Sequence, residues 1–226
     1  MTRIIGIVTA FALGCVFSAY GETLSAVLAR LDAAAPSFSG VTAHMTEITH
    51  TAVLNEDTTD KGLFRMQRHG KEVRALVDFS GEKDKRVLFF ADRSAHVYYP
   101  NLNLVQVYDL GSQSKLIDEY LLLGFGVSGK DLQKAYNIQV LGTEAVNGKN
   151  TSRLELIPKD PATREQLVKA EIWIPEDSAL PVQQKIYQKN GNFTLVQYSD
   201  LRLTPSSDKQ PLKLVTPPGT KTEHPH

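Results

Sequence analysis

The feature that most constrains this chain is a succession of short strand-like segments joined by connections of hairpin length. In residues 62–68, for example, Phe64, Met66 and Arg68 share one face of an expected strand, because alternate side chains point to opposite faces. Connections this short join antiparallel neighbours. We therefore predict about ten to twelve short strands in one strongly curved antiparallel sheet.

The other expected strands lie in both halves of the chain, with turn signals between them. Asn190-Gly191 is a strong hairpin signal, and Asn147-Gly148 marks another turn. The expected strands are residues 39–51, 73–79, 87–90, 96–99, 104–108, 136–141, 152–157, 170–174, 182–188 and 193–203.

An amphipathic helix is expected before the first strand. Leu24, Val27, Leu28 and Leu31 recur at helical spacing, and Pro36 ends the pattern. Such a helix has one apolar side, so we expect it to pack on the sheet.

The middle of the chain replaces the strand pattern with a helical insertion. Residues 115–123 carry apolar side chains along nearly all of one side. Ser128 and Asp131 then form a capping box that begins a short helix ending near Ala135. The overall class is therefore mainly β, with an N-terminal helix and a helical segment available to cover the sheet.

The first 21 residues have the pattern of a secretory signal peptide. Arg3 supplies a positive charge, residues 4–17 are almost purely apolar, and small residues stand at Ala19 and Gly21. We expect cleavage between Gly21 and Glu22, which predicts export to the periplasm.

The rest of the chain is expected to form a single domain over residues 22–216. Residues 217–226 are rich in Pro, Lys and His, and we predict a disordered tail there. A formal net charge of zero gives no basic excess for binding nucleic acid, so no nucleic-acid partner is expected.

Cys15, the single cysteine, lies inside the N-terminal segment. Residues 12–15, Ala-Leu-Gly-Cys, resemble the acylation box of bacterial lipoproteins, with Ala where Leu is usual. Val16-Phe17 continue the apolar run where lipoproteins normally turn polar. Acylation at Cys15 would anchor the chain to a membrane, whereas cleavage after Gly21 leaves a mature chain without cysteine. Both alternatives remain open, and the cleaved, unanchored chain is favoured.

Residues 124–131 match a GxGxxG pattern and, except at the last position, a phosphate-binding loop. Such a loop needs Ser or Thr after its Lys to ligate Mg²⁺, and Asp131 stands there instead. A carboxylate beside phosphates would be repelled by them. We interpret the stretch as a Gly-rich hinge between two helical segments.

The sequence contains no other motif that indicates catalysis or metal binding. The six histidines do not form an HExxH or similar spacing, and GxSxG is absent. We therefore predict no catalytic residues, no metal site, no cofactor and no enzymatic activity.

The helical insertion is more apolar than a segment that faces water should be. A curved sheet too wide to be filled by its own side chains leaves an apolar cavity under such a cover. An ordinary filled core is the alternative, and the residues alone favour neither. If a cavity is present, we expect it to be lined by Phe64, Met66, Val87, Phe89, Leu116, Ile117, Tyr120, Leu121 and Leu123.

Eight short segments follow one another in a specific order along the chain. They are residues 38–40, 62–68, 87–92, 97–100, 121–124, 136–138, 154–158 and 216–219. Their order and spacing resemble the LolA-like family, the periplasmic carriers and sorting proteins for outer-membrane lipoproteins. The resemblance covers most of the chain after residue 21. It implies an incomplete β-barrel whose apolar concave face is covered by helices, with acyl chains bound between the sheet and a helical lid.

The resemblance also implies a function. It predicts a monomeric carrier that takes acyl chains of lipoproteins or lipids from an inner-membrane donor complex to an outer-membrane acceptor. In this family an Arg of the second strand pairs with the lid, and Arg68 matches its place, although His69 stands where Pro is usual. The alternative is a lipid- or lipoprotein-sensing module of the same fold that transports nothing, including one anchored through Cys15.

Overall fold

The computed structural model describes residues 22–225 except 71, 82–83, 112–122 and 206–209. The first strands of its sheet are β1 (Gly40–Thr51), β2 (Glu56–His69), β3 (Glu72–Phe79), β4 (Arg86–Ala91), β5 (Ser94–Tyr99) and β6 (Leu104–Asp109). The later strands are β7 (Tyr136–Val146), β8 (Lys149–Pro158), β9 (Lys169–Pro175), β10 (Gln183–Tyr187), β11 (Phe193–Leu203) and β12 (Lys221–Glu223).

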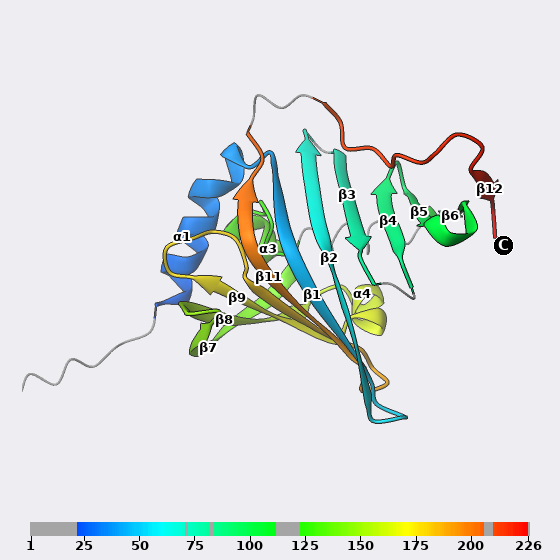
Figure 1. Cartoon of the computed structure of the whole chain (residues 1–226). Coiled ribbons are helices and arrows are strands. Elements are labelled where there is room, and N and C mark those ends of the chain that lie inside the picture. Colours follow the sequence, from blue (N-terminus) through cyan, green and yellow to red (C-terminus); the bar gives the residue numbers. More distant parts are fainter. Residues whose placement is uncertain (1–21, 71, 82–83, 112–122, 206–209, 226) are drawn as a thin grey trace, which may run out of the picture.

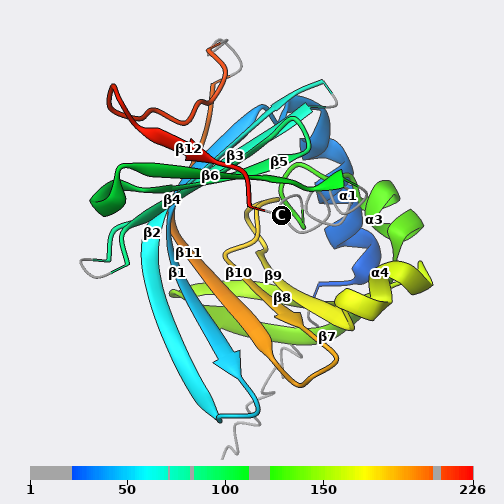
Figure 2. The same ribbon diagram turned by 90° about the vertical axis from the view of Figure 1, so that its right-hand side faces the viewer.

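These strands form one 12-stranded sheet in the order β12-β6-β5-β4-β3-β2-β1-β11-β10-β9-β8-β7. Neighbouring strands in this order pair antiparallel, including β1 with β11, except that β12 pairs parallel with β6. The sheet curls around its concave face (Figures 1 and 2), and its end strands do not pair with each other within the described residues. The predicted curved, incomplete barrel of ten to twelve strands is confirmed.

Helices cover one part of the concave face. These are α1 (Leu24–Ala34) and α3 (Gly129–Ala135). The other helical segments are α4 (Pro161–Gln166) and the 3₁₀ turns η1 (Ala35–Ser37) and η2 (Pro100–Leu102). α1 begins at Thr23, whose Oγ1 accepts a hydrogen bond from the Ala26 amide at 3.3 Å. Because this cap and the apolar spacing agree, the predicted N-terminal helix forms, and it buries Val27, Leu28 and Leu31.

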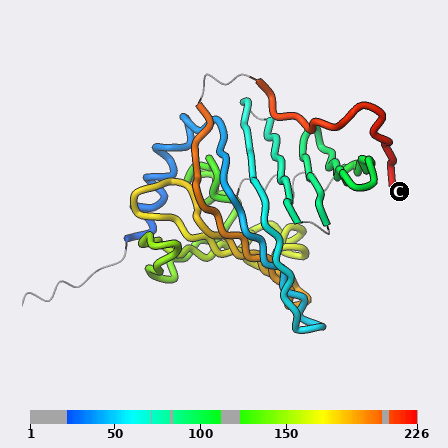
Figure 3. Tube along the Cα trace, viewed as in Figure 1, coloured from blue at the N-terminus to red at the C-terminus, as the bar shows by residue number. Residues whose placement is uncertain are grey.

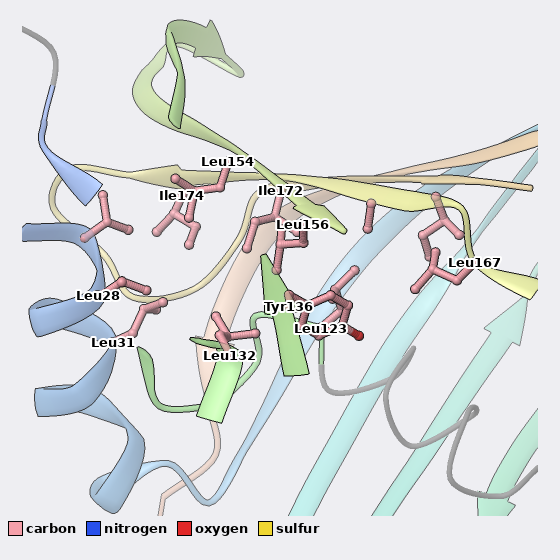
Figure 4. Packing of buried hydrophobic residues seen from close by; sticks show 13 residues of the cluster. Leu28, Leu31, Leu123, Leu132, Tyr136, Leu154, Leu156, Leu167, Ile172 and Ile174 are labelled. Atoms are coloured by element: carbon pink, nitrogen blue, oxygen red, sulfur yellow. The ribbon is translucent and has the colours of Figure 1, made fainter. Parts of the chain in front are cut away.

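α1 and α3 pack against the concave side of β8 and β9 (Figure 4). Leu154, Leu156, Ile172 and Ile174 of these strands are fully buried beneath them. Each such side chain contributes about 1.5–3 kcal/mol through removal of its surface from water. We call this cluster the helix-covered core.

The Gly-rich stretch of residues 124–131 packs closely against α1 and the chain that follows it. The Ser128 hydroxyl accepts from the Asp131 amide at 3.1 Å, which confirms the predicted start of α3. A Cβ on Gly129 would lie 2.6 Å from the Leu28 carbonyl oxygen, and one on Gly126 would lie 2.1 Å from the Phe38 ring. These glycines are therefore explained by the approach of α1 and of the chain around Phe38.

The Asn-Gly turns form as expected. Asn147 and Gly148 both adopt positive φ, 51° and 75°, and so connect β7 to β8 in a two-residue turn. Gly191, with φ 83°, lies in the connection between β10 and β11. The long β1–β2 hairpin projects at one end of the sheet, next to the connection between β10 and β11 (Figure 3).

The prediction of a disordered tail over 217–226 is wrong where the structure forms a strand, at residues 221–223. β12 pairs with β6, and the Thr220 hydroxyl donates to Asn103 Oδ1 at 2.8 Å. An edge strand presents unpaired backbone groups that accept another strand. Composition does not reveal this pairing, because it is made by backbone atoms.

Residues 1–21, with Cys15 and the predicted cleavage residue Gly21, lie outside the described residues, and Glu22 is the first that the structure describes. In the described part of the chain, no helix has the length and hydrophobicity needed to cross a bilayer.

Candidate functional site

A cavity of about 260 Å³ lies on the concave face of the sheet, beside the helix-covered core. We call it the inner cavity. Most of its wall is apolar, with Glu47, Arg86, Gln184, Thr194 and Tyr198 as the polar members. The apolar wall comes from β1 to β4, β10 and β11 and consists of Met45, Phe64, Val77, Phe79, Leu88, Phe90, Ile186 and Val196.

Strand register explains which residues face this cavity. Phe64 of β2 pairs with Val77 of β3, and Val77 pairs with Leu88 of β4. Directly opposed residues of neighbouring antiparallel strands share one face of the sheet. Phe64, Val77 and Leu88 therefore form a continuous apolar row across the concave face.

The predicted inward positions of Val87 and Phe89 are wrong. Both lie on the outer face, where Phe89 pairs with Leu76 and packs against Leu212 and Leu214 of the C-terminal segment. The sequence Val-Leu-Phe-Phe is apolar on both faces, so alternation gives no sign of which residues point inward.

The remaining predicted cavity residues fall into two groups. Met66 and Leu123 are buried in the core next to the cavity and do not line it. The others, Leu116, Ile117, Tyr120 and Leu121, lie outside the described residues.

The described end of the helical insertion is residues 123–126, which we call the lid base. Its Phe125 is fully buried, with ring centroids 5.6 Å from Phe64 and 5.1 Å from Tyr198. Phe125 therefore packs on the aromatic floor of the concave face, beside the inner cavity. The residues expected to line a cavity did not include it, although it ends the apolar run of the insertion.

Arg68 of β2 hydrogen-bonds to the lid base and to the end of α1. Its Nη1 donates to the Gly126 carbonyl at 2.6 Å, and its Nη2 donates to the carbonyls of Ala35 at 2.7 Å and Phe38 at 3.3 Å. A guanidinium satisfied by several carbonyls can be held away from bulk water at little cost. The contacts join three segments that are distant in sequence; whether they act as a latch stays a prediction.

Gln184 of β10 bonds to the lid base from the opposite side. Its Nε2 donates to the Leu123 carbonyl, and its Oε1 accepts from the Tyr198 hydroxyl at 2.9 Å. Burial raises the pKa of Tyr198, so its hydroxyl stays protonated and donates. Gln184 and Tyr198 also line the inner cavity, and a ligand there contacts the groups that hold the lid base.

Charged groups lie at one end of the inner cavity. Arg86 forms an ion pair with Asp60 at 2.9 Å and covers the Phe79 ring at 4.2 Å. Burial, followed by the charge of Asp60, raises the pKa of the Glu47 carboxyl. This cluster supplies a carboxyl and a guanidinium that a polar group of a ligand could contact.

Sequence reasoning missed Glu47, Gln184 and Tyr198. Each is a polar residue at an inward position of a strand, and such a residue looks like a surface residue until register is known. Among the described residues, no group of three or more His, Cys, Asp or Glu side chains is placed to hold a metal ion.

A family model described as "Uncharacterized protein"-like matches residues 73–202, more than half of the chain. No curated protein matches the sequence.

Several solved structures are similar in fold. An uncharacterized conserved protein from Thermus thermophilus is 9% identical, covers 90% of this chain and 100% of its own, and has a TM-score of 0.52. A putative outer membrane lipoprotein-sorting protein domain from Vibrio parahaemolyticus is 16% identical, with 83% and 96% coverage and a TM-score of 0.43. The LolA superfamily protein NE2245 from Nitrosomonas europaea is also 16% identical, with 83% and 96% coverage and a TM-score of 0.37.

Proposed function

This chain belongs to the family whose model matches residues 73–202, and we propose that it is a periplasmic carrier that binds acyl chains of lipoproteins or lipids. The observation that carries this proposal is the inner cavity, whose apolar wall is built from six strands next to the buried lid base. A carrier of this kind binds and releases its cargo and carries out no chemistry.

Energetics favour an acyl chain as the ligand. Each buried methylene contributes about 0.8 kcal/mol, so eight of them contribute about 6 kcal/mol. Ligand pockets typically measure about 300–1,000 Å³, and the inner cavity, at about 260 Å³, is slightly smaller than that range. We therefore infer that this is a closed conformation, and that cargo enters when the lid base moves away from the sheet.

The contacts of Arg68 and Gln184 suit them to stabilise that closed state. Arg68 makes three hydrogen bonds to carbonyls of the lid base and the α1 end. Opening breaks these bonds at a combined net cost of about 1.5–3 kcal/mol, because the freed groups then bond to water, and their re-formation favours release. A carrier needs both binding and release, so a latch of this strength fits the proposed role.

The route of the cargo is part of the proposal. The expected signal peptide places the mature chain in the periplasm, where it would act as a monomer between an inner-membrane donor and an outer-membrane acceptor. The resemblance of the sequence to the LolA-like family supports lipoprotein cargo on such a route.

The second candidate is a sensor of lipid or mislocalised lipoprotein, and the acylation-like residues 12–15 favour it. An anchored protein cannot cross the periplasm as a shuttle. Mass spectrometry of the exported chain separates the two candidates: an N-terminus at Glu22 supports the carrier, and a diacylated Cys15 supports the sensor.

The test of acyl binding uses two neighbouring residues of β4. An apolar fluorescent dye should bind the protein and be displaced by a long-chain lipid. Leu88→Gln, on the cavity wall, should weaken dye binding by about tenfold, since it replaces apolar wall with an amide. Val87→Gln, on the outer face of the same strand, is the matched control and should leave binding unchanged. Equal effects of the two substitutions, or no dye binding at all, would contradict the proposal.

A further inference from the structure

A second cavity, of about 590 Å³, lies on the other side of the sheet from the inner cavity. We call it the outer groove. It is bounded by the ends of β1, β2 and β11 and by the chain on both sides of residues 206–209. Figure 1 shows this C-terminal segment running past the ends of β2 and β3, and the Leu212 amide attaches it to Gln67 Oε1 at 2.6 Å.

The charged residues that the structure describes along the outer groove are cations. Arg65, Arg202 and Lys213 line it, and none of its described lining residues is acidic. None of the three forms an ion pair or hydrogen bond with a described residue. The other arginines named above in β2 and β4 have partners: Arg68 bonds carbonyls and Arg86 pairs with Asp60.

Strand register brings two of these cations together. Thr42 of β1 pairs with Arg65 of β2 on one side and with Arg202 of β11 on the other. Two strand spacings separate the Arg backbones by about 10 Å. Two long side chains can converge over that distance, with Thr42 between their strands, and Lys213 also lines the groove.

Arg65 also has an unmet hydrogen-bonding requirement. Its Nε is buried and has no hydrogen-bond partner among the described residues. A buried donor on a charged group is costly when unpaired, and such atoms in native proteins call for an explanation. An anion bound beside the Arg65 guanidinium would give this group an acceptor.

We propose that the outer groove is an anion site for a phosphate group, separate from the inner cavity and independent of its function. A phosphate has enough oxygens to accept paired hydrogen bonds from two guanidinium forks and another from Lys213. Leu203 lines both this groove and a smaller apolar cavity beside the end of α1. The phosphate of an anionic lipid headgroup therefore fits the site as well as free phosphate does.

The first test is calorimetric titration of inorganic phosphate into the full mature chain at low ionic strength, with chloride as the reference anion. Arg65→Gln and Arg202→Gln should each weaken phosphate binding by about tenfold, since each removes a charged donor. Lys130→Gln removes one positive charge from α3, away from the groove, and should change the affinity less than about twofold. Arg202 is exposed, so its variant tests the site even if Arg65→Gln fails to fold.

The second test distinguishes the sources of the phosphate. Sedimentation with vesicles that contain phosphatidylglycerol, against vesicles of phosphatidylcholine alone, reports headgroup binding. Binding to the first vesicles alone, lost in Arg202→Gln, assigns the site to anionic lipid; phosphate binding without vesicle binding assigns it to a soluble phosphate. The proposal is overturned if neither binds, or if Lys130→Gln weakens binding as much as the groove variants do.

Discussion

The two halves of the concave face differ in what covers them. Over β8 and β9, α1 and α3 fill the space, and Leu154, Leu156, Ile172 and Ile174 are fully buried. Over β2 to β4 the described cover is the lid base with Phe125, and the inner cavity remains beside it. The same kind of apolar strand face thus gives a filled core in one half and a potential binding site in the other.

The largest effect that tests this difference is on stability. Leu156→Ala in the helix-covered core should lower the free energy of unfolding by about 2–5 kcal/mol, because it opens a void in a packed region. Leu88→Ala, at the partly buried cavity wall, should cost about 1 kcal/mol. Urea denaturation measures both. Equal losses would mean that the two halves are equally well packed.

The next effect is on the release of cargo. Arg68→Leu removes the bonds that stabilise the closed state, so it should slow lipid release by roughly 10–100-fold without abolishing binding. Stopped-flow dye displacement measures the rate.

Arg164→Leu is the control for that experiment. Arg164 also donates to a backbone carbonyl, that of Pro158 at 3.0 and 2.7 Å, but it lies on α4, outside the inner cavity. Loss of binding in Arg68→Leu, or equal release rates in the two variants, would exclude the latch.

The smallest expected effect is a pH dependence of the free energy of unfolding, which comes from Glu47 of the inner cavity. Burial, then Asp60, raises the pKa of Glu47, whereas Arg86 lowers it by less. A raised folded-state pKa means that the folded protein holds this proton more tightly. The resulting stabilisation is present below the unfolded-state pKa and is lost as pH rises through the folded one.

The comparison for Glu47 is with Glu47→Gln, which cannot titrate. Between about pH 4 and pH 7 the wild-type free energy of unfolding should fall relative to that of the variant. Urea titrations at several pH values measure the difference. A constant difference across this range would show that folding does not raise the pKa of Glu47.

Several parts of the molecule follow from local sequence. The Asn-Gly turn at residues 147–148, the α1 spacing and the Ser128 cap each depend on a few neighbouring residues, and each forms as predicted. Phe64 faces the concave side because its strand alternates, and alternation is visible in sequence.

The sequence by itself therefore determined the fold class, the number of strands and the caps and turns, since these arise from propensity and periodicity within short windows. Tertiary structure decided the rest. In β4, Val87 and Phe89 point outward because a C-terminal segment far away in the sequence covers that face. β12 is ordered because β6 offers a free edge, and Glu47, Gln184 and Tyr198 meet the lid base or cavity through strand register. These outcomes depend on contacts between distant segments, which no local pattern encodes.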